Sequence, residues 1–267
     1  MNNKIKLNEI YCMDNLKLLK QMADESVDLI YCDILYNTGK KFKDFDDKLG
    51  TPQEAMEWYK PRLIEMKRVL KNTGSIYFQC DYRLVHYLKV EMDNIFGLNN
   101  FRNEIIWHYQ NFYKSNTFKK VHDNILYYSK STEYIYNPQL LYPDNPDRYN
   151  KVDENGRYFT NGRGDKCYYG KNLKCPDVWS YLKEKEFHTL NSQSKERTGY
   201  DTQKPKSLLK RIIKSSSNEG DIVADFFCGS GTSMVVAKEL DRQYIGCDIN
   251  PRAVEITNKR LKGEAYE

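Results

Sequence analysis

The chain has 267 residues, of which 30% are charged and 13% aromatic, with an unusual 22 tyrosines and a net charge of +5. No apolar run approaches the roughly 18–20 residues that a membrane span needs, and the first residues lack a signal-peptide pattern. We therefore expect a cytoplasmic globular protein, large enough for one α/β domain with an insert. The modest positive charge permits binding to nucleic acid without requiring it.

Short β-rich runs alternate with helical patterns along most of the chain. The first part contains predicted strands at 9–13, 27–32 and 75–79 and predicted helices at 53–70 and 84–96. The C-terminal part continues in the same way, with strands at 222–226 and 243–247 and helices at 205–215, 234–240 and 251–261. Because the predicted strands are largely apolar, the alternation indicates an α/β fold with a parallel sheet covered by helices on both faces.

The middle of the chain breaks this alternation. Three further runs, at 104–110, 124–128 and 133–136, are predicted as strands that complete the first half. Residues 137–200 then carry many Pro, Gly, Asn and Asp residues, a composition typical of loops. We therefore predict a loop-rich insert at 137–200 between two parts of one domain.

Seven cysteines are scattered along the chain, and their spacing does not favour a metal site. Cys167 and Cys175 lack a second pair of suitable spacing, so we expect neither zinc nor another metal. Four others lie in or beside predicted strands, where a free thiol behaves as a small apolar side chain: Cys12, Cys32, Cys80 and Cys247.

A glycine-rich turn follows the predicted strand at 222–226. Gly229 and Gly231 allow close approach of a ligand to the backbone, and the next residues open a predicted helix. No lysine follows the second glycine, which disfavours a phosphate-binding loop of the P-loop kind. Asp248 ends the next strand, 23 residues after Asp225, a spacing suited to a carboxylate that binds ribose hydroxyls. A purely structural tight turn remains the alternative.

A second polar group, Asp33 to Tyr36, directly follows the predicted strand at 27–32. A carboxylate at the carboxyl end of a strand points into the crevice where open α/β sheets bind ligands. Three residues later, the Tyr36 ring could stack on a planar base. From spacing alone, an ordinary strand-to-loop turn is the alternative.

Together these segments resemble a known family. Residues 31–42 (YCDILYNTGKKF) resemble the catalytic motif region of amino-methylating DNA methyltransferases, whose usual form is Asp-Pro-Pro-Tyr or Asp-Pro-Pro-Phe. Residues 225–232 resemble the cofactor motif of that family, and 202–205 its companion motif. The similarity continues through 74–111, 122–130 and 191–199, and it is greatest to the modification subunits of type III restriction systems. The order of the motifs is that of the β class, a circular permutation of the Rossmann-like methyltransferase sheet.

The resemblance implies S-adenosylmethionine as the cofactor. Asp248 matches the carboxylate on the ribose hydroxyls, and Asp14 matches the position beside the cofactor adenine. Gln203 and Lys204 match the segment near the methionine carboxylate. The positions that match the family's cofactor site are Asp14, Gln203, Lys204, Asp225, Phe227, Gly229, Ser230, Gly231 and Asp248.

The resemblance also implies catalysis by the segment Asp33–Tyr36. Asp33 and a backbone carbonyl would accept the two hydrogens of an adenine N6 amine, and Tyr36 would stack on the flipped base. The two usual prolines are replaced by Ile34 and Leu35, which keep the carbonyls but add two N–H donors that need partners. Cytosine-N4 methylation and a catalytically weakened DNA-binding homologue are the alternatives.

The implied organisation has a catalytic half at 1–136, a target-recognition insert at 137–200 and a cofactor-binding half at 201–267. Double-stranded DNA is the implied partner, contacted also by a loop that carries Lys40, Lys41 and Lys43, unless this loop is simply solvated. A homodimer or a restriction subunit would be a further partner. A restriction–modification system and a solitary, nucleoid-associated enzyme both fit the resemblance.

Overall fold

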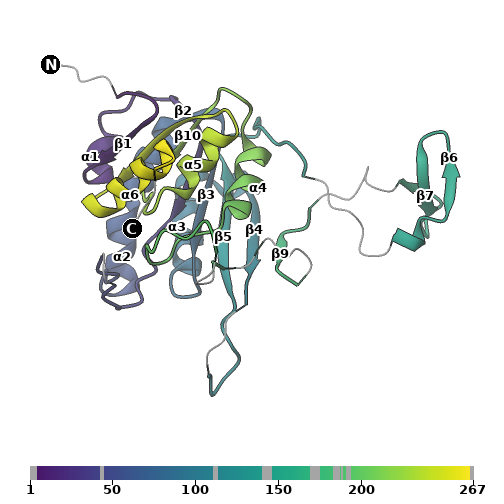
Figure 1. Ribbon diagram of the computed structural model, residues 1–267, viewed down its shortest axis with the longest axis horizontal. Helices are drawn as coiled ribbons and strands as arrows, with labels where there is room; N and C mark the ends of the chain where they lie inside the picture. The colour runs from purple at the N-terminus through teal and green to yellow at the C-terminus, as the bar shows by residue number, and fades with distance from the viewer. Residues whose placement is uncertain are drawn as a thin grey trace.

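The computed structural model describes residues 5–42, 45–110, 114–139, 146–168, 175–182, 187, 189–190 and 194–264. Its centre is an eight-stranded sheet in the order β1-β11-β10-β2-β3-β5-β4-β9 (Figure 1). The strands are β1 (Glu9–Cys12), β2 (Val27–Asp33), β3 (Leu70–Cys80), β4 (Phe101–His108), β5 (His122–Ser129), β9 (Val178–Ser180), β10 (Ile222–Asp225) and β11 (Gln243–Asp248). Five neighbouring strands, from β1 to β3, are parallel, whereas β5 is antiparallel to both of its neighbours. The α/β prediction is confirmed, but the sheet is mixed and not parallel throughout.

Among the described residues, six α-helices cover the two faces of this sheet. They are α1 (Asn15–Leu19), α2 (Pro52–Val69), α3 (Val85–Phe96), α4 (Lys206–Ser216), α5 (Thr232–Glu239) and α6 (Pro251–Lys262), and a 3₁₀ turn, η1 (Leu98–Asn100), leads into β4. Capping explains several boundaries: Thr51 and Glu54 form a capping box at the start of α2, and Asn250 caps α6 before Pro251. Pro205, expected in the first turn of α4, is the residue before that helix.

The alternation of side chains along the strands divides the core in two. Ile30 and Cys32 of β2 face the layer formed by α1, α2 and α3, whereas Leu29 and Tyr31 face the layer of α4 and α5. This pattern is expected of strands whose two faces are both covered. Cys32, Cys80 and Cys247 are buried as expected, but Cys12 is exposed because it ends an edge strand.

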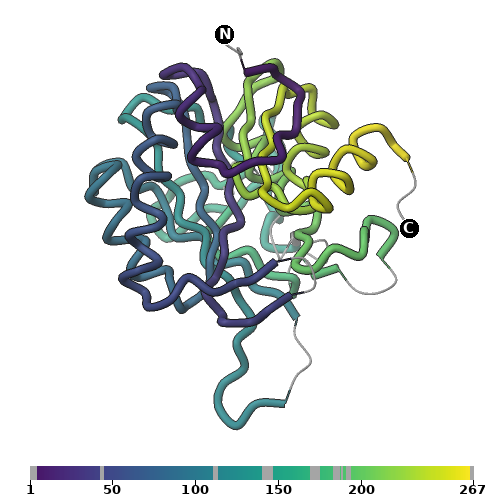
Figure 2. The backbone as a smooth tube through the Cα atoms, turned by 90° about the vertical axis from the view of Figure 1, so that its left-hand side faces the viewer, coloured from purple at the N-terminus to yellow at the C-terminus, as the bar shows by residue number. Residues whose placement is uncertain are grey.

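Segments from the two ends of the chain lie side by side at one edge of the sheet (Figure 2). Strand β1 pairs in parallel with β11, and β10 pairs with β2 in the centre. The C-terminal strands therefore complete the sheet beside the N-terminal ones. This arrangement is the one expected of a circularly permuted Rossmann-like sheet.

The region 137–200 has two structural parts. A separate three-stranded sheet, formed by β6 (Lys151–Asp153), β7 (Gly156–Thr160) and β8 (Lys166–Tyr168), stands away from the main body after the turn η2 (Pro146–Arg148) (Figure 1). By contrast, β9 joins the main sheet beside β4. The strand predicted at 133–136 is wrong: this segment makes a backbone bond from Ile135 to Thr73 but forms no ladder.

Two features are absent from the described ranges. No helix there is long and apolar enough to cross a bilayer. No group of three or more His, Cys, Asp or Glu side chains in those ranges is arranged to hold a metal ion.

Candidate active site

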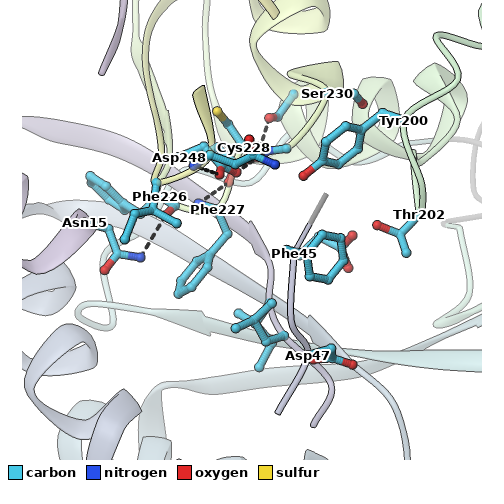
Figure 3. Close-up of a pocket in the computed structure, with 18 of the residues that line it drawn as sticks. Asn15, Phe45, Asp47, Tyr200, Thr202, Phe226, Phe227, Cys228, Ser230 and Asp248 are labelled. Atoms are coloured by element: carbon cyan, nitrogen blue, oxygen red, sulfur yellow. Dashed lines mark hydrogen bonds between the residues drawn. The ribbon is translucent and has the colours of Figure 1, made fainter. Parts of the chain in front are cut away.

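A cavity of about 550 Å³ opens at the carboxyl ends of β2, β10 and β11 (Figure 3). It is lined by the segment from Asp33 to Tyr36 and by the glycine turn from Asp225 to Ser230, two segments that are almost 190 positions apart in the chain. Asp14, Gln203, Lys204 and Asp248 also line it. The fold therefore brings the predicted catalytic and cofactor-binding segments together around one space.

Asp33 is the last residue of β2, and both of its carboxylate oxygens already have donors. The Lys204 ammonium forms a close ion pair with Oδ2, and the Tyr36 hydroxyl lies 2.8 Å from Oδ1. Burial raises the pKa of the Asp33 carboxyl above its ordinary value, although the charge of Lys204 opposes the shift. The pair also joins the two sequence halves of the domain.

The Tyr36 hydroxyl has a second carboxylate beside it. Oδ2 of Asp123, a buried residue of β5, lies 2.9 Å from the hydroxyl oxygen. Gln79 and Tyr109 donate to the same Asp123 carboxylate at 2.9 and 3.0 Å. A phenol carries one proton, so the Tyr36 hydroxyl donates to one of its two carboxylates at a time.

Ile34 and Leu35 each have a backbone N–H that a proline at the same position would lack. The Ile34 N–H donates to the carbonyl of Gln79 at 3.3 Å, which extends the β2–β3 ladder by one residue. The Leu35 carbonyl accepts a bond of 2.9 Å from the buried hydroxyl of Tyr59. Within the described ranges, neither the Ile34 carbonyl nor the Leu35 N–H has a hydrogen-bond partner.

The glycine turn has the backbone conformation that its sequence predicts. Gly229 and Gly231 have φ angles of 49° and 72°, in the left-handed region that favours glycine. Asp225 accepts hydrogen bonds from the Phe227 N–H and from the hydroxyl of Ser233, and burial raises the pKa of its carboxyl to about 7. This carboxylate therefore links the start of the turn to the first residues of α5.

The two glycines serve different purposes. The Gly229 N–H donates to Oδ2 of Asp248 at 2.9 Å, which ties the turn to the end of β11 beside the cavity (Figure 3). A Cβ atom at Gly231 would lie 2.2 Å from Cγ2 of Thr257, so this glycine permits close packing against α6. Gly231 is outside the cavity lining, which leaves its predicted contact with a cofactor without support from the geometry.

Asp14 and Asp248 provide two further carboxylates of the cavity. Asp248 accepts backbone bonds from Gly229 and Asn250, one at each carboxylate oxygen, and burial raises the pKa of its carboxyl. Asp14 caps α1 and forms an ion pair of 2.8 Å with Arg62. The Arg62 guanidinium lies 3.4 Å above the ring of Trp58, another lining residue.

The segment before α4 differs from expectation. Lys204, expected near a methionine carboxylate, is paired with Asp33 instead. The Gln203 amide accepts from Thr198 and donates to the carbonyl of Glu196, so its polar atoms hold the 196–203 loop together. Both residues line the cavity, but their polar groups are occupied by the protein.

Lys40 and Lys41, after the catalytic segment, lie on a loop that is organised by Asp47. This buried carboxylate accepts bonds from the N–H groups of Asn37 and Thr38. Lys40 and Lys41 are exposed, and Lys43 lies outside the described residues.

Three residues that hold the site were not singled out from the sequence: Tyr59, Arg62 and Asp123. Asp123 could have been suspected, because it is the one carboxylate in the strand His122–Ser129. Tyr59 and Arg62 lie on the buried face of α2, where helical spacing predicts burial but not the partners of a hydroxyl or a guanidinium.

Comparison with known proteins identifies the family. The family model described as DNA methylase matches residues 27–259. The chain belongs to this family of amino-methylating DNA methyltransferases. It is 34% identical over 256 residues to the type II methyltransferase M.HpaI of Haemophilus parainfluenzae, covering 96% of this chain and 74% of that protein.

Two further relatives extend this result. The DNA adenine methyltransferase YhdJ of Escherichia coli is 30% identical over 254 residues, covering 93% of this chain and 80% of the relative. The crystal structure of the M1.HpyAVI–SAM complex has a similar fold, with a TM-score of 0.57 at 20% identity, covering 95% of this chain and 98% of that one. The fold prediction is thus confirmed, whereas the particular likeness to type III modification subunits stays a prediction.

Proposed function

We propose that this DNA methyltransferase transfers a methyl group from S-adenosylmethionine to N6 of an adenine that is flipped out of double-stranded DNA. The observation that carries the proposal is the shared cavity, in which Asp33 lies opposite the glycine turn and Asp248. A base and a methyl donor that enter this space meet at the end of β2.

The lining fits the cofactor. Its volume of about 550 Å³ is in the range typical of small-molecule sites, and its walls combine the rings of Trp58 and Phe227 with a few carboxylates. Asp248 lines the cavity at the end of β11 and would accept the ribose hydroxyls there, and Asp14 would lie beside the adenine. S-adenosylmethionine supplies a methyl group on a sulfonium, and the protein contributes orientation and acceptors.

Two acceptors are available for the target amine. The exocyclic nitrogen of adenine is a poor nucleophile, because its lone pair is delocalised into the ring. If Asp33 and the Ile34 carbonyl, which has no partner among the described residues, accept its two hydrogens, the nitrogen becomes pyramidal and its lone pair is directed at the methyl group. A carboxylate in the first motif position favours adenine over cytosine.

The target amine would share the Asp33 carboxylate with its present donors or displace one of them. Asp123 provides the Tyr36 hydroxyl with a second acceptor at 2.9 Å, so Tyr36 can release Asp33 without leaving a buried hydroxyl unpaired. Lys204 lies 5.5 Å from the centre of the Tyr36 ring and can remain near it as a cation. The tyrosine ring then stays in place to stack on the flipped base.

We assign the DNA-facing surface to the edge of the sheet that carries the cavity. Exposed Lys40 and Lys41 follow the catalytic segment, and the exposed arm between β4 and β5 carries Lys114 and Lys119. Such lysines neutralise phosphates and do not read sequence. The small sheet β6–β8, within the proposed recognition region 137–200, would supply base contacts.

A methyl-transfer assay tests the proposal. The protein is incubated with tritiated S-adenosylmethionine and unmethylated genomic DNA, and the digested product is analysed by mass spectrometry. We expect N6-methyladenine from the wild type and at least a roughly hundredfold loss in Asp33→Ala. Asp24→Ala, which removes an exposed carboxylate paired with Arg68, should retain activity.

Each alternative has its own outcome in this assay. N4-methylcytosine in the product would identify the chain as a cytosine methyltransferase. DNA binding without transfer would identify a catalytically weakened homologue. Methylome sequencing of a host that expresses the gene would define the target site, and a restriction gene beside it would distinguish a restriction–modification system from a solitary enzyme.

A further inference from the structure

Ile34 and Leu35 occupy the positions at which the family's usual motif has two prolines. Each proline would fix its own φ angle and restrict the residue before it to extended conformations. This chain lacks that covalent restraint at the point where a backbone carbonyl must be held beside Asp33. Something else has to fix the backbone there.

Two hydrogen bonds replace the missing restraint. The Ile34 N–H bonds to the Gln79 carbonyl of β3 at 3.3 Å, a bond that proline cannot make. One residue later, the Tyr59 hydroxyl donates to the Leu35 carbonyl at 2.9 Å. The segment is therefore pinned once to the neighbouring strand and once to helix α2.

Tyr59 is well suited to hold the segment. Its side chain is fully buried. The centre of its ring lies 6.1 Å from the ring centre of Phe78 and 6.2 Å from that of Phe227, which lines the cavity. The Leu35 carbonyl is the hydroxyl's hydrogen-bond partner within the described ranges. A buried hydroxyl without a partner is costly, so the bond fixes the ring and the carbonyl together.

We propose that Tyr59 is a positioning residue that takes over the role of the absent prolines: it fixes the Leu35 carbonyl and leaves the Ile34 carbonyl beside Asp33 as the acceptor for the target amine. This inference rests on the proposed function. It also distinguishes the two positions, because a proline at 34 would remove the bond to Gln79. A proline at 35 would remove an N–H that has no partner in the described ranges, at a residue whose φ is not positive.

The test is a rescue experiment. Tyr59→Phe removes only the hydroxyl and should lower kcat roughly tenfold, as expected for the loss of one net hydrogen bond, with KM for S-adenosylmethionine nearly unchanged. Adding Leu35→Pro to Tyr59→Phe should restore kcat, and Leu35→Pro alone should remain active. Tyr128→Phe is the matched control, because that buried hydroxyl bonds Asp93 at 2.7 Å and does not contact the motif. Its effect, if any, should not be rescued.

Hydrogen–deuterium exchange provides a readout that does not depend on activity. Peptides covering residues 33–38 should exchange roughly five- to tenfold faster in Tyr59→Phe than in the wild type, and Leu35→Pro should reverse the change. Unchanged exchange and kcat in Tyr59→Phe would overturn the inference. So would a loss that Leu35→Pro fails to restore, or inactivity of Leu35→Pro itself.

The failure of the proposed function would look different. In that case the wild-type protein would transfer no methyl group to DNA, whereas the exchange experiment would still report whether Tyr59 holds the segment. If Tyr59→Phe does not fold, the single variant Leu35→Pro is measured instead. Its hydrogen exchange and activity then show whether position 35 accepts a proline.

Discussion

The backbone conformation of the glycine turn at 225–232 is set by bonds within the turn and by two left-handed glycines, and other elements then bind it. The catalytic segment Asp33–Tyr36 instead depends mainly on side chains from distant elements. Within the turn, the Phe227 N–H bonds the Asp225 carboxylate and the Gly231 N–H bonds the Cys228 carbonyl. Carbonyls of the turn also accept bonds from side chains of α1 and α6, namely Asn15, Thr257 and Arg260. Around the catalytic segment, the donors and acceptors come from α2, from β5 and from the segment before α4. The conformation of the glycine turn thus follows largely from its local sequence, whereas that of the catalytic segment depends on the tertiary fold.

This difference predicts that substitutions in the glycine turn and substitutions around the catalytic segment will have separable effects. Changes in the turn should affect folding and cofactor affinity. Changes around Asp33 should affect turnover at nearly constant affinity.

The largest effect is expected at Gly231. In Gly231→Ala, the new Cβ would meet Thr257 Cγ2 at 2.2 Å while the residue keeps a φ of 72°. Strain and overpacking together should reduce the free energy of unfolding by roughly 3 kcal/mol, measured by urea denaturation. Gly263→Ala has a similar φ of 74° but open space, and it should cost only about 1 kcal/mol. Equal losses in the two variants would show that packing against α6 is not what Gly231 provides.

Asp248→Ala should act on cofactor affinity. It removes the proposed acceptor of the ribose hydroxyls and the partner of the Gly229 N–H, so Kd for S-adenosylmethionine should rise roughly thirtyfold by calorimetry. The kcat at saturating cofactor should change much less. A large loss of kcat with unchanged Kd would break the division between the two sides.

Asp123→Ala should act on turnover. Without Asp123, the Tyr36 hydroxyl keeps only Asp33 as an acceptor and competes with the target amine for it. We expect kcat to fall roughly tenfold, with Kd for the cofactor unchanged. In a Tyr36→Phe background the same substitution should cost less, because the hydroxyl to be held is absent. Additive losses would contradict this role.

Lys204→Met should change the pH dependence. Burial raises the pKa of Asp33 and Lys204 opposes that shift, so removing the cation should raise this pKa further. Since Asp33 must be ionised to accept the amine, activity is lost as pH falls through its pKa. The acid limb of kcat/KM should therefore move to higher pH in Lys204→Met. Lys206→Met, which removes a cation paired with Glu239, should leave the limb in place.

The same comparison explains how much could be predicted from the sequence. Most strands and helices of the main sheet, the glycine turn and Asp248 follow from local patterns of hydrophobicity and glycine, and the structure has them where they were expected. The short helix α1 and the strands β6 to β9 were not predicted. The partner of Lys204 could not be predicted, because it depends on which strand ends meet at one edge of the sheet. The bond between Tyr59 and Leu35 likewise joins residues 24 positions apart on different elements.

The error at 133–136 has a similar origin. Tyr134, Ile135 and Tyr136 have the composition of a strand, and their segment runs beside the start of β3. The position next to β3 in the sheet is taken by β5, however, so the segment keeps only isolated bonds. These residues do favour a strand, but β5 already occupies the place beside β3, so the segment does not join the sheet.

The central claim is that the cofactor and the target base meet in the cavity between Asp33 and the glycine turn. A crystal structure with S-adenosylmethionine bound tests it most directly. We predict that the ribose hydroxyls contact Asp248 and that the methyl group faces the space beside Asp33 and the Ile34 carbonyl. A cofactor bound outside this cavity, or one whose methyl group points away from Asp33, would contradict the claim.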